Sequence, residues 1–179
     1  RLGGSGEGSP VLADINDDGV FEIVIGDGSG QVHVIDGATA TELDGWPALT
    51  DANTAHANTP AHENGVPLIR DLILSSPGVG DLEGDGYPEI VVTGYYGGVY
   101  VFSDDGTPKE GFPVYTIGRT PEEFDVLHTY DQGSMSAPTL YDLDGDGYLE
   151  IIVAAMDSRL YIFDHTGADW GPYPLEICV

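Results

Sequence analysis

The stretch YDLDGDGYLEI, residues 141–151, places four carboxylates and two glycines directly before an apolar segment. The acids alternate with other residues at Asp142, Asp144 and Asp146, and Glu150 follows at the ninth position counted from Asp142. Carboxylates this close in the chain repel one another unless a cation neutralises them. The stretch therefore predicts a tight acidic turn that holds a cation and leads into a buried β-strand.

The same pattern occurs three times in the 179 residues. The acidic loops begin at Asp14, Asp81 and Asp142, which are 67 and then 61 residues apart. An apolar run, a small-residue turn and a second apolar run follow each loop, and each repeat then closes on a cluster of aromatic residue, Gly and Pro. These clusters are Gly45-Trp46-Pro47, Gly111-Phe112-Pro113 and residues 170–174. A period of this length indicates that each repeat is one supersecondary unit that stacks on its neighbours.

Each repeat predicts four short antiparallel strands. A short segment enters the acidic loop, and a run rich in β-branched residues leaves it at residues 22–26, 89–94 or 150–155. A second such run follows the small-residue turn. A fourth, poorer strand is expected over the aromatic and Pro cluster, because Pro suits an outer edge. The runs are apolar on both faces, which is typical of strands between neighbouring sheets. We expect an all-β fold of three four-stranded antiparallel β-propeller blades.

The repeat length and number also define the domain organisation. The rungs of a parallel β-helix are far shorter than these repeats, which disfavours that fold. Three blades form an incomplete ring, since propellers typically have at least four. We therefore expect residues 1–179 to be a single partial propeller, either part of a longer propeller or a homo-oligomer; the start at Arg1 without Met also suggests an excised piece. The blades are expected at about 9–49, 75–115 and 135–176, with inter-blade loops at about 50–74 and 116–134.

The charge of the chain excludes two classes of partner. Five Lys and Arg face 31 Asp and Glu, which gives a formal net charge of −26. Nucleic acid and anionic membrane surfaces would be repelled, and no run of 18 apolar residues is available for membrane insertion. Cations are the natural partners, either metal ions or the salt of a saline habitat. Cys178 is the only cysteine, so no disulfide can form within the chain.

The three acidic loops share the form D-x-[DNE]-x-D-G-x-x-E. Side chains at positions 1, 3 and 5 point oxygens at one centre, glycine at position 6 permits the sharp turn, and the position-7 carbonyl and position-9 carboxylate complete an oxygen cage. Oxygen ligands in a flexible loop suit Ca²⁺, whereas zinc and copper call for His or Cys. A single loop could be a solvated turn, but three in-phase copies favour three calcium sites. The expected ligands are Asp14, Asn16, Asp18, Val20 and Glu22; Asp81, Glu83, Asp85, Tyr87 and Glu89; and Asp142, Asp144, Asp146, Tyr148 and Glu150.

The middle site is expected to be the weakest of the three. Glu83 occupies position 3 there, where the shorter Asp or Asn fits better. Three bound ions at +2 each would change the net charge from −26 to −20, so calcium would neutralise the loops but not the surface.

These repeats resemble the FG-GAP and VCBS repeats of integrin α-subunit propellers and of many secreted bacterial proteins, from about Ser9 to Pro174. The resemblance implies that the calcium loop joins the first and second strands of a blade, with ligands at positions 1, 3, 5 and 9. The chain has IGDG, TGYY and AAMD where integrins tend to have Gly-Ala-Pro, and Glu replaces the usual position-9 Asp. It is therefore more similar to the bacterial and archaeal type.

The resemblance implies an extracellular, non-enzymatic segment, secreted or at the cell surface, for adhesion, protein or glycan recognition, or surface assembly. The alternative is the propeller portion of a secreted polysaccharide-degrading or peptidase enzyme, because similar repeats occur in rhamnogalacturonan lyases and beside peptidase domains. Strands that reverse direction place the calcium loops on one face and the inter-blade loops on the other, where we expect the partner. Candidate contact residues there are His56, His62, Glu63, Arg70, Tyr95, Tyr96, Glu122, His128 and Tyr130.

Overall fold

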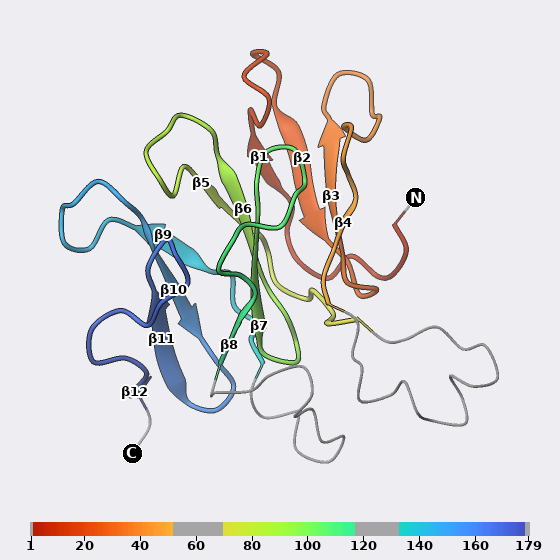
Figure 1. Cartoon of the computed structure of the whole chain (residues 1–179). Coiled ribbons are helices and arrows are strands. Elements are labelled where there is room, and N and C mark those ends of the chain that lie inside the picture. Colours follow the sequence, from red (N-terminus) through yellow and green to blue (C-terminus); the bar gives the residue numbers. More distant parts are fainter. Residues whose placement is uncertain (1, 52–69, 117–132, 178–179) are drawn as a thin grey trace, which may run out of the picture.

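The computed structural model describes residues 2–51, 70–116 and 133–177 of the chain. These residues form three four-stranded antiparallel sheets, and they include no helix long and apolar enough to cross a membrane. Blade 1 contains β1 (Val11–Ala13), β2 (Glu22–Gly26), β3 (Gln31–Asp36) and β4 (Ala48–Leu49); blade 2 contains β5 (Gly78–Gly80), β6 (Glu89–Thr93), β7 (Gly98–Phe102) and β8 (Val114–Tyr115); blade 3 contains β9 (Thr139–Tyr141), β10 (Glu150–Ala154), β11 (Arg159–Phe163) and β12 (Leu175–Glu176). The predicted all-β architecture of three antiparallel blades is confirmed (Figure 1).

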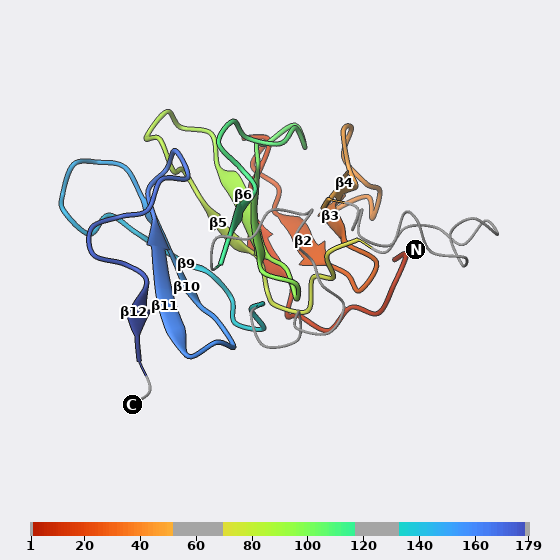
Figure 2. The same ribbon diagram turned by 60° about the horizontal axis from the view of Figure 1, so that its bottom comes forward.

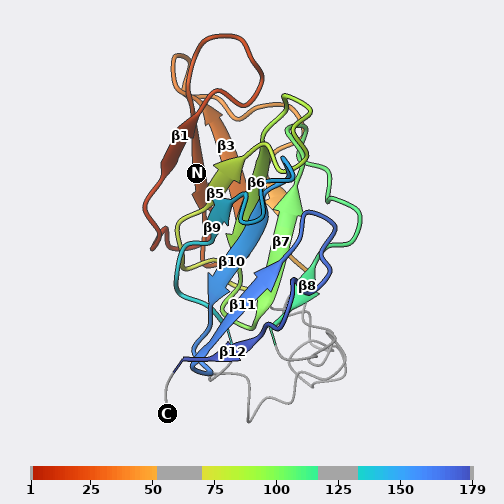
Figure 3. The same cartoon turned by 90° about the vertical axis from the view of Figure 1, so that its left-hand side faces the viewer.

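Within each blade the strands pair in sequence order. Hairpin connections join them, so that Ile23 pairs with Ile35 in blade 1 and Ile90 pairs with Phe102 in blade 2. The three sheets lie side by side from the N-terminal to the C-terminal end of the chain (Figures 1 and 2). Seen from the side of blade 3, they stand one behind another (Figure 3). Blade 2 is therefore covered on both faces.

Two apolar layers hold the blades together. Ile90 and Val92 of β6 join the cluster shared with blade 1, whereas Val91 between them joins the cluster shared with blade 3. Every residue of β6 and β7 is buried, as the continuous apolar runs predicted. In β2, by contrast, buried and half-buried residues alternate. The reason is that the described chain has no sheet on the outer side of blade 1.

The aromatic and Pro clusters pack against the next blade. The Trp46 ring meets the Phe102 ring edge-on, with centroids 6.3 Å apart, and its Nε1–H donates to the Asp104 carbonyl at 3.3 Å. A side chain at Gly45 would collide with the Asp105 backbone, which is why the chain can approach so closely there. One detail of the prediction is wrong: the fourth strand does not cover the cluster but follows it, beginning in blade 1 at Ala48.

Candidate metal centres

The three acidic loops connect the first and second strands of each blade. In Figure 1 they project from the same end of the sheets, with the loop of blade 3 at the left edge. In each loop the position-1 carboxylate accepts the N–H of the position-6 glycine, and the position-5 carboxylate accepts the N–H of position 7. The first bond is 2.9 Å for Gly19, 2.7 Å for Gly86 and 3.0 Å for Gly147; the second is 2.8 Å for Val20, 2.9 Å for Tyr87 and 2.9 Å for Tyr148.

The position-6 glycines adopt the backbone conformation that the sequence pattern predicts. Their φ angles are 85° at Gly19, 94° at Gly86 and 94° at Gly147, a region that side chains disfavour. A Cβ at any of the three would meet no atom within 4 Å, so the backbone angle, rather than crowding, is what favours glycine here.

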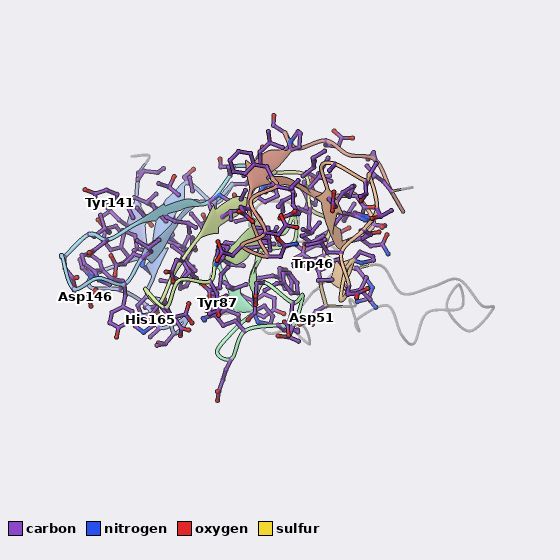
Figure 4. All side chains as sticks on the ribbon, turned by 90° about the horizontal axis from the view of Figure 1, so that it is seen from above. Trp46, Asp51, Tyr87, Tyr141, Asp146 and His165 are labelled. Carbon is purple, nitrogen blue, oxygen red and sulfur yellow. The ribbon has the colours of Figure 1, made fainter. Side chains whose placement is uncertain are left out.

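The third loop gathers three carboxylates. Asp142, Asp144 and Asp146 each place one oxygen within 4.8 Å of the others, and none of the ion pairs among the described residues involves them. Asp146 lies at the outer edge of the molecule in Figure 4, where an ion from solvent can reach it. Three converging carboxylates are the donor set that Ca²⁺ prefers. The residues of this loop fit a calcium ion.

The glutamate at position 9 has a backbone role in all three loops. One of its oxygens accepts the N–H of position 2, at 2.7 Å from Ile15, 2.8 Å from Leu82 and 2.7 Å from Leu143. Glu22, Glu89 and Glu150 are all buried. Glu150 lies outside the group of three carboxylates within 4.8 Å. One oxygen of each glutamate is therefore bonded to the backbone, and only its second oxygen can contact a metal ion or a positively charged side chain.

In the first loop that second oxygen is unpaired. Glu22 is fully buried, and its Oε1 has no hydrogen-bond partner among the described residues. Asn16 takes the place of a carboxylate at position 3, and its Nδ2 lies 3.2 Å from Asp18 Oδ2. A buried carboxylate oxygen without a partner is costly unless a cation lies beside it. The first loop therefore leaves a place for a cation beside Glu22, although among the described residues only the third loop brings three carboxylates within 4.8 Å of one another.

The middle loop differs because a lysine reaches into it. Nζ of Lys109 lies 2.8 Å from Oε2 of Glu83 and 3.0 Å from Oε1 of Glu89, and the lysine side chain is only 11% exposed. Burial lowers the pKa of Lys109, but the hydrogen bonds and charges of the two glutamates raise it by more. Sequence analysis missed this residue, although Lys109 is the only lysine of the chain.

A cleft of about 620 Å³ opens beside Lys109 on the same face. The connections after β7 and β11 line it, together with Glu83. His165 lines the cleft, and the Tyr148 ring of the third loop stacks on the His165 ring, with centroids 4.2 Å apart. The acidic loops, Lys109 and this cleft thus share one end of the blades.

At the opposite end, each blade holds one carboxylate against the turn between its second and third strands. Each carboxylate accepts the N–H of the first residue of the third strand, and each lies close to the ring side chain two residues further on. In blade 1, Asp27 accepts the Gln31 N–H at 3.1 Å and lies 3.4 Å from the His33 ring. In blade 2, Asp71 accepts the Gly98 N–H at 3.0 Å and the Tyr100 hydroxyl at 3.2 Å. In blade 3, Asp157 accepts the Arg159 N–H at 3.1 Å and the Tyr161 hydroxyl at 2.7 Å. Sequence analysis missed this series because Asp71 comes from the inter-blade segment rather than from the turn.

Two of these carboxylates have opposite pKa shifts. Burial raises the pKa of Asp71 to about 7, against the smaller lowering effects of the Tyr96 N–H, the Gly98 N–H and the Tyr100 hydroxyl. Burial also acts to raise the pKa of Asp27, but the hydrogen bonds from Ser29, Gly4 and Gln31 outweigh it and lower the pKa to about 2. Burial is the largest cause of the pKa shift for both carboxylates, and the sign depends on whether the hydrogen bonds together outweigh it, as they do at Asp27 and do not at Asp71.

Only part of the predicted partner surface is described. The Arg70 guanidinium donates to the Thr50 carbonyl, and the Tyr95 and Tyr96 rings meet edge-on with centroids 5.5 Å apart. The other predicted contact residues lie outside the described residues, as does Cys178. They are His56, His62, Glu63, Glu122, His128 and Tyr130.

Comparisons with known proteins agree with the β-propeller blade arrangement. Residues 81–153, which span the middle and third acidic loops, match the FG-GAP-like repeat family. A chain in the crystal structure of BBS1N in complex with ARL6DN, soaked with lead, superposes with a TM-score of 0.64 and 12% identity, covering 98% of this chain and 46% of that one. BamB from Moraxella catarrhalis superposes with a TM-score of 0.51 and 17% identity, covering 93% of this chain and 36% of BamB.

The chain spans less than half of the length of both solved structures. No curated protein matches it. Identities this low show the fold alone, and the fold agrees with the three stacked sheets described above. The chain forms three β-propeller blades, and its residues 81–153 match the FG-GAP-like repeat family.

Proposed function

We propose that this chain is a calcium-binding β-propeller segment of an extracellular protein, secreted or at the cell surface, that serves adhesion, protein or glycan recognition, or surface assembly. The observation that carries the proposal is the convergence of Asp142, Asp144 and Asp146 within 4.8 Å. The buried, unpaired Oε1 of Glu22 supports it independently, in a second loop.

Calcium would act as a structural ion. In the third loop Asp142, Asp144 and Asp146 would hold it; in the first loop Asp14, Asp18 and Glu22 would. An ion at either loop neutralises carboxylates that otherwise repel one another, and this ties the two strands on either side of the loop together. Ligand-driven stabilisation of this kind is set by the ion concentration relative to the dissociation constant.

The ligand chemistry supports the proposed extracellular location. Calcium sites of extracellular modules have dissociation constants of about 10⁻⁴–10⁻³ M, and we assign these exposed loops to that class, which extracellular calcium saturates. The net charge of −26 suits the same setting, because it keeps the protein soluble and away from anionic surfaces.

The partner is proposed to bind the face opposite the calcium loops. Stacked blades form a rigid scaffold, and the described ends of the inter-blade segments lie against the turns at that face: the Thr50 and Thr116 N–H groups donate to the Gly30 and Gly97 carbonyls, both at 2.9 Å. BBS1N, in the similar crystal structure, is held in a complex with ARL6DN, so a propeller of this likeness binds another protein. Adhesion, recognition and assembly would each use this surface while calcium holds the blades.

Direct calcium titration tests the proposal. Isothermal titration of the metal-free 179-residue chain should show saturable Ca²⁺ binding with dissociation constants of about 10⁻⁴–10⁻³ M. Asp142→Asn should remove the third-loop site, whereas Asp44→Asn, at an exposed carboxylate outside the loops, should leave binding unchanged. No saturable binding at 10-fold higher calcium would overturn the proposal.

The recognition part of the proposal needs its own test. The calcium-loaded chain, immobilised and probed with a library of extracellular glycans, should retain a ligand that EDTA releases. A hydrolytic or lytic activity on the same glycans would instead favour a role within a polysaccharide-degrading enzyme.

A further inference from the structure

We propose that the middle loop binds no calcium, because the Lys109 ammonium supplies the positive charge there, so that the chain takes two calcium ions and not three. This inference rests on the proposed calcium binding of the other two loops. It departs from the expectation, drawn from the repeated sequence, of three calcium sites of which the middle one is the weakest.

The contacts of Glu89 provide the first argument. Its Oε2 accepts the Leu82 N–H at 2.8 Å, and its Oε1 accepts from Lys109 Nζ at 3.0 Å. Both oxygens of the position-9 carboxylate therefore have partners within the chain. In the first loop, by contrast, the matching Oε1 of Glu22 has none among the described residues. The middle loop lacks the free oxygen that an ion would need at position 9.

The length of Glu83 provides the second argument. Position 3 is Asn16 in the first loop and Asp144 in the third, so Glu83 has the longest side chain at that position. Its Oε2 lies 2.8 Å from Lys109 Nζ. The extra methylene that makes Glu83 a poor calcium ligand is thus used to reach the lysine.

The position of Lys109 in the repeat provides the third argument. Its N–H donates to the carbonyl of Val101 in β7, and the equivalent bonds join Leu43 to Val34 in blade 1 and Trp170 to Ile162 in blade 3, all at 2.9 Å. Leu43 and Trp170 therefore occupy the matching positions, and neither carries a charge. The lysine and the longer glutamate occur in the same blade, and each would be poorly accommodated without the other.

A calcium ion in the middle loop would have to displace this ammonium. The lysine side chain is largely buried, so a displaced charge would lose two carboxylate partners in a region of low dielectric. The ammonium is also tethered, so its local concentration does not fall when calcium is removed. Blade 2, the one covered on both faces, therefore keeps its loop folded without metal, and calcium controls the loops of the outer blades.

Counting bound ions tests the inference. Native mass spectrometry of the 179-residue chain in millimolar calcium should give two ions. Three ions would overturn the inference and leave the proposed function standing. No bound ion would overturn the proposed function, and the inference with it.

Variants separate the loops. Asp81→Asn and Asp142→Asn change the same loop position; the first should leave the count at two and the second should lower it to one. A count lowered by Asp81→Asn would contradict the inference, and this pair decides the question even if lysine variants fail to fold. Lys109→Met should raise the count to three, whereas Lys109→Arg, which keeps the charge, should leave it at two. A Lys109→Met variant that folds and still binds only two ions would also contradict the inference.

Discussion

The Tyr100 hydroxyl donates a hydrogen bond of 3.2 Å to the Asp71 carboxylate, although Asp71 belongs to the segment before blade 2 and Tyr100 lies in its third strand. The same carboxylate accepts the Tyr96 N–H at 2.7 Å and the Gly98 N–H at 3.0 Å. Any side chain at Gly94 would collide with it. Asp71 thus fastens the inter-blade segment onto blade 2, in the position that Asp27 occupies within blade 1.

We expect Asp71→Asn to change how stability depends on pH. The pKa of Asp71 is raised to about 7 by burial, so the folded chain keeps a proton that the unfolded chain has released above its pKa of about 4. The stability that this retained proton adds to the folded chain is fully present below about pH 4. It is lost as the pH rises to about 7, at roughly 1.4 kcal/mol per pH unit.

Urea unfolding in EDTA at pH 5 and pH 8 measures how the free energy of unfolding depends on pH in the variant and in wild type. Relative to wild type, Asp71→Asn should be more stable at pH 8 than at pH 5, so the difference in the free energy of unfolding (variant minus wild type) should increase with pH. Asp44→Asn is the control for the general effect of removing one charge from an acidic chain. Parallel pH curves for Asp71→Asn and wild type would show that Asp71 is ionised throughout this range.

Calcium should stabilise the chain far more than sodium does. Two sites at about ten times their dissociation constants contribute roughly 3 kcal/mol, because each adds about 1.4 kcal/mol. For a chain of this size, that free energy raises Tm by roughly 6–11 °C. Differential scanning calorimetry in CaCl₂ and in NaCl of equal ionic strength measures the difference. Equal shifts in the two salts would mean that screening of the surface charge, typical of a halophile, is the cause.

Glu22→Gln should have opposite effects with and without calcium. The amide oxygen can still accept the Ile15 N–H, but the buried negative charge is gone. In EDTA the free energy of unfolding of the variant should therefore exceed that of wild type by about 1–3 kcal/mol, since an uncompensated buried charge has been removed. The variant should then unfold at a higher urea concentration. In saturating calcium the order should reverse, because one ligand of the first loop is lost. A variant less stable than wild type in EDTA would show that Oε1 has a stabilising partner.

Trp46→Ala should weaken the contact between blades 1 and 2. Trp46 is 8% exposed and packs against Phe102, so its truncation should lower the free energy of unfolding by about 3–5 kcal/mol. Trp170→Ala is the matched control, because Trp170 belongs to the same cluster in blade 3 but is only half-buried and has no further described blade beside it. Urea unfolding should show a clearly smaller loss for Trp170→Ala, and equal losses would argue against inter-blade packing.

The sequence was sufficient to predict the three blades because their signals are local. Runs of β-branched residues between glycine turns specify strands such as Glu89–Thr93, and repetition removes the ambiguity of a single run. The loop spacing likewise predicted that Asp142, Asp144 and Asp146 converge, since alternate residues of a tight turn face the same centre. The fourth strand was misplaced because a two-residue pairing such as Ala48–Leu49 has almost no sequence signal.

The sequence alone therefore determined the repeat, the strands and the acidic loops, and it predicts the kind of ion that suits the loops. Only the tertiary structure decided which charge each loop meets. Lys109 reaches Glu89 from 20 residues away, and Asp71 reaches Tyr100 from 29 residues away. Neither pair follows from the strand period or from turn chemistry, because both depend on how segments far apart in the sequence meet when blade 2 folds. Burial at those meeting points then fixes which carboxylate has a raised pKa and which pair with the lysine.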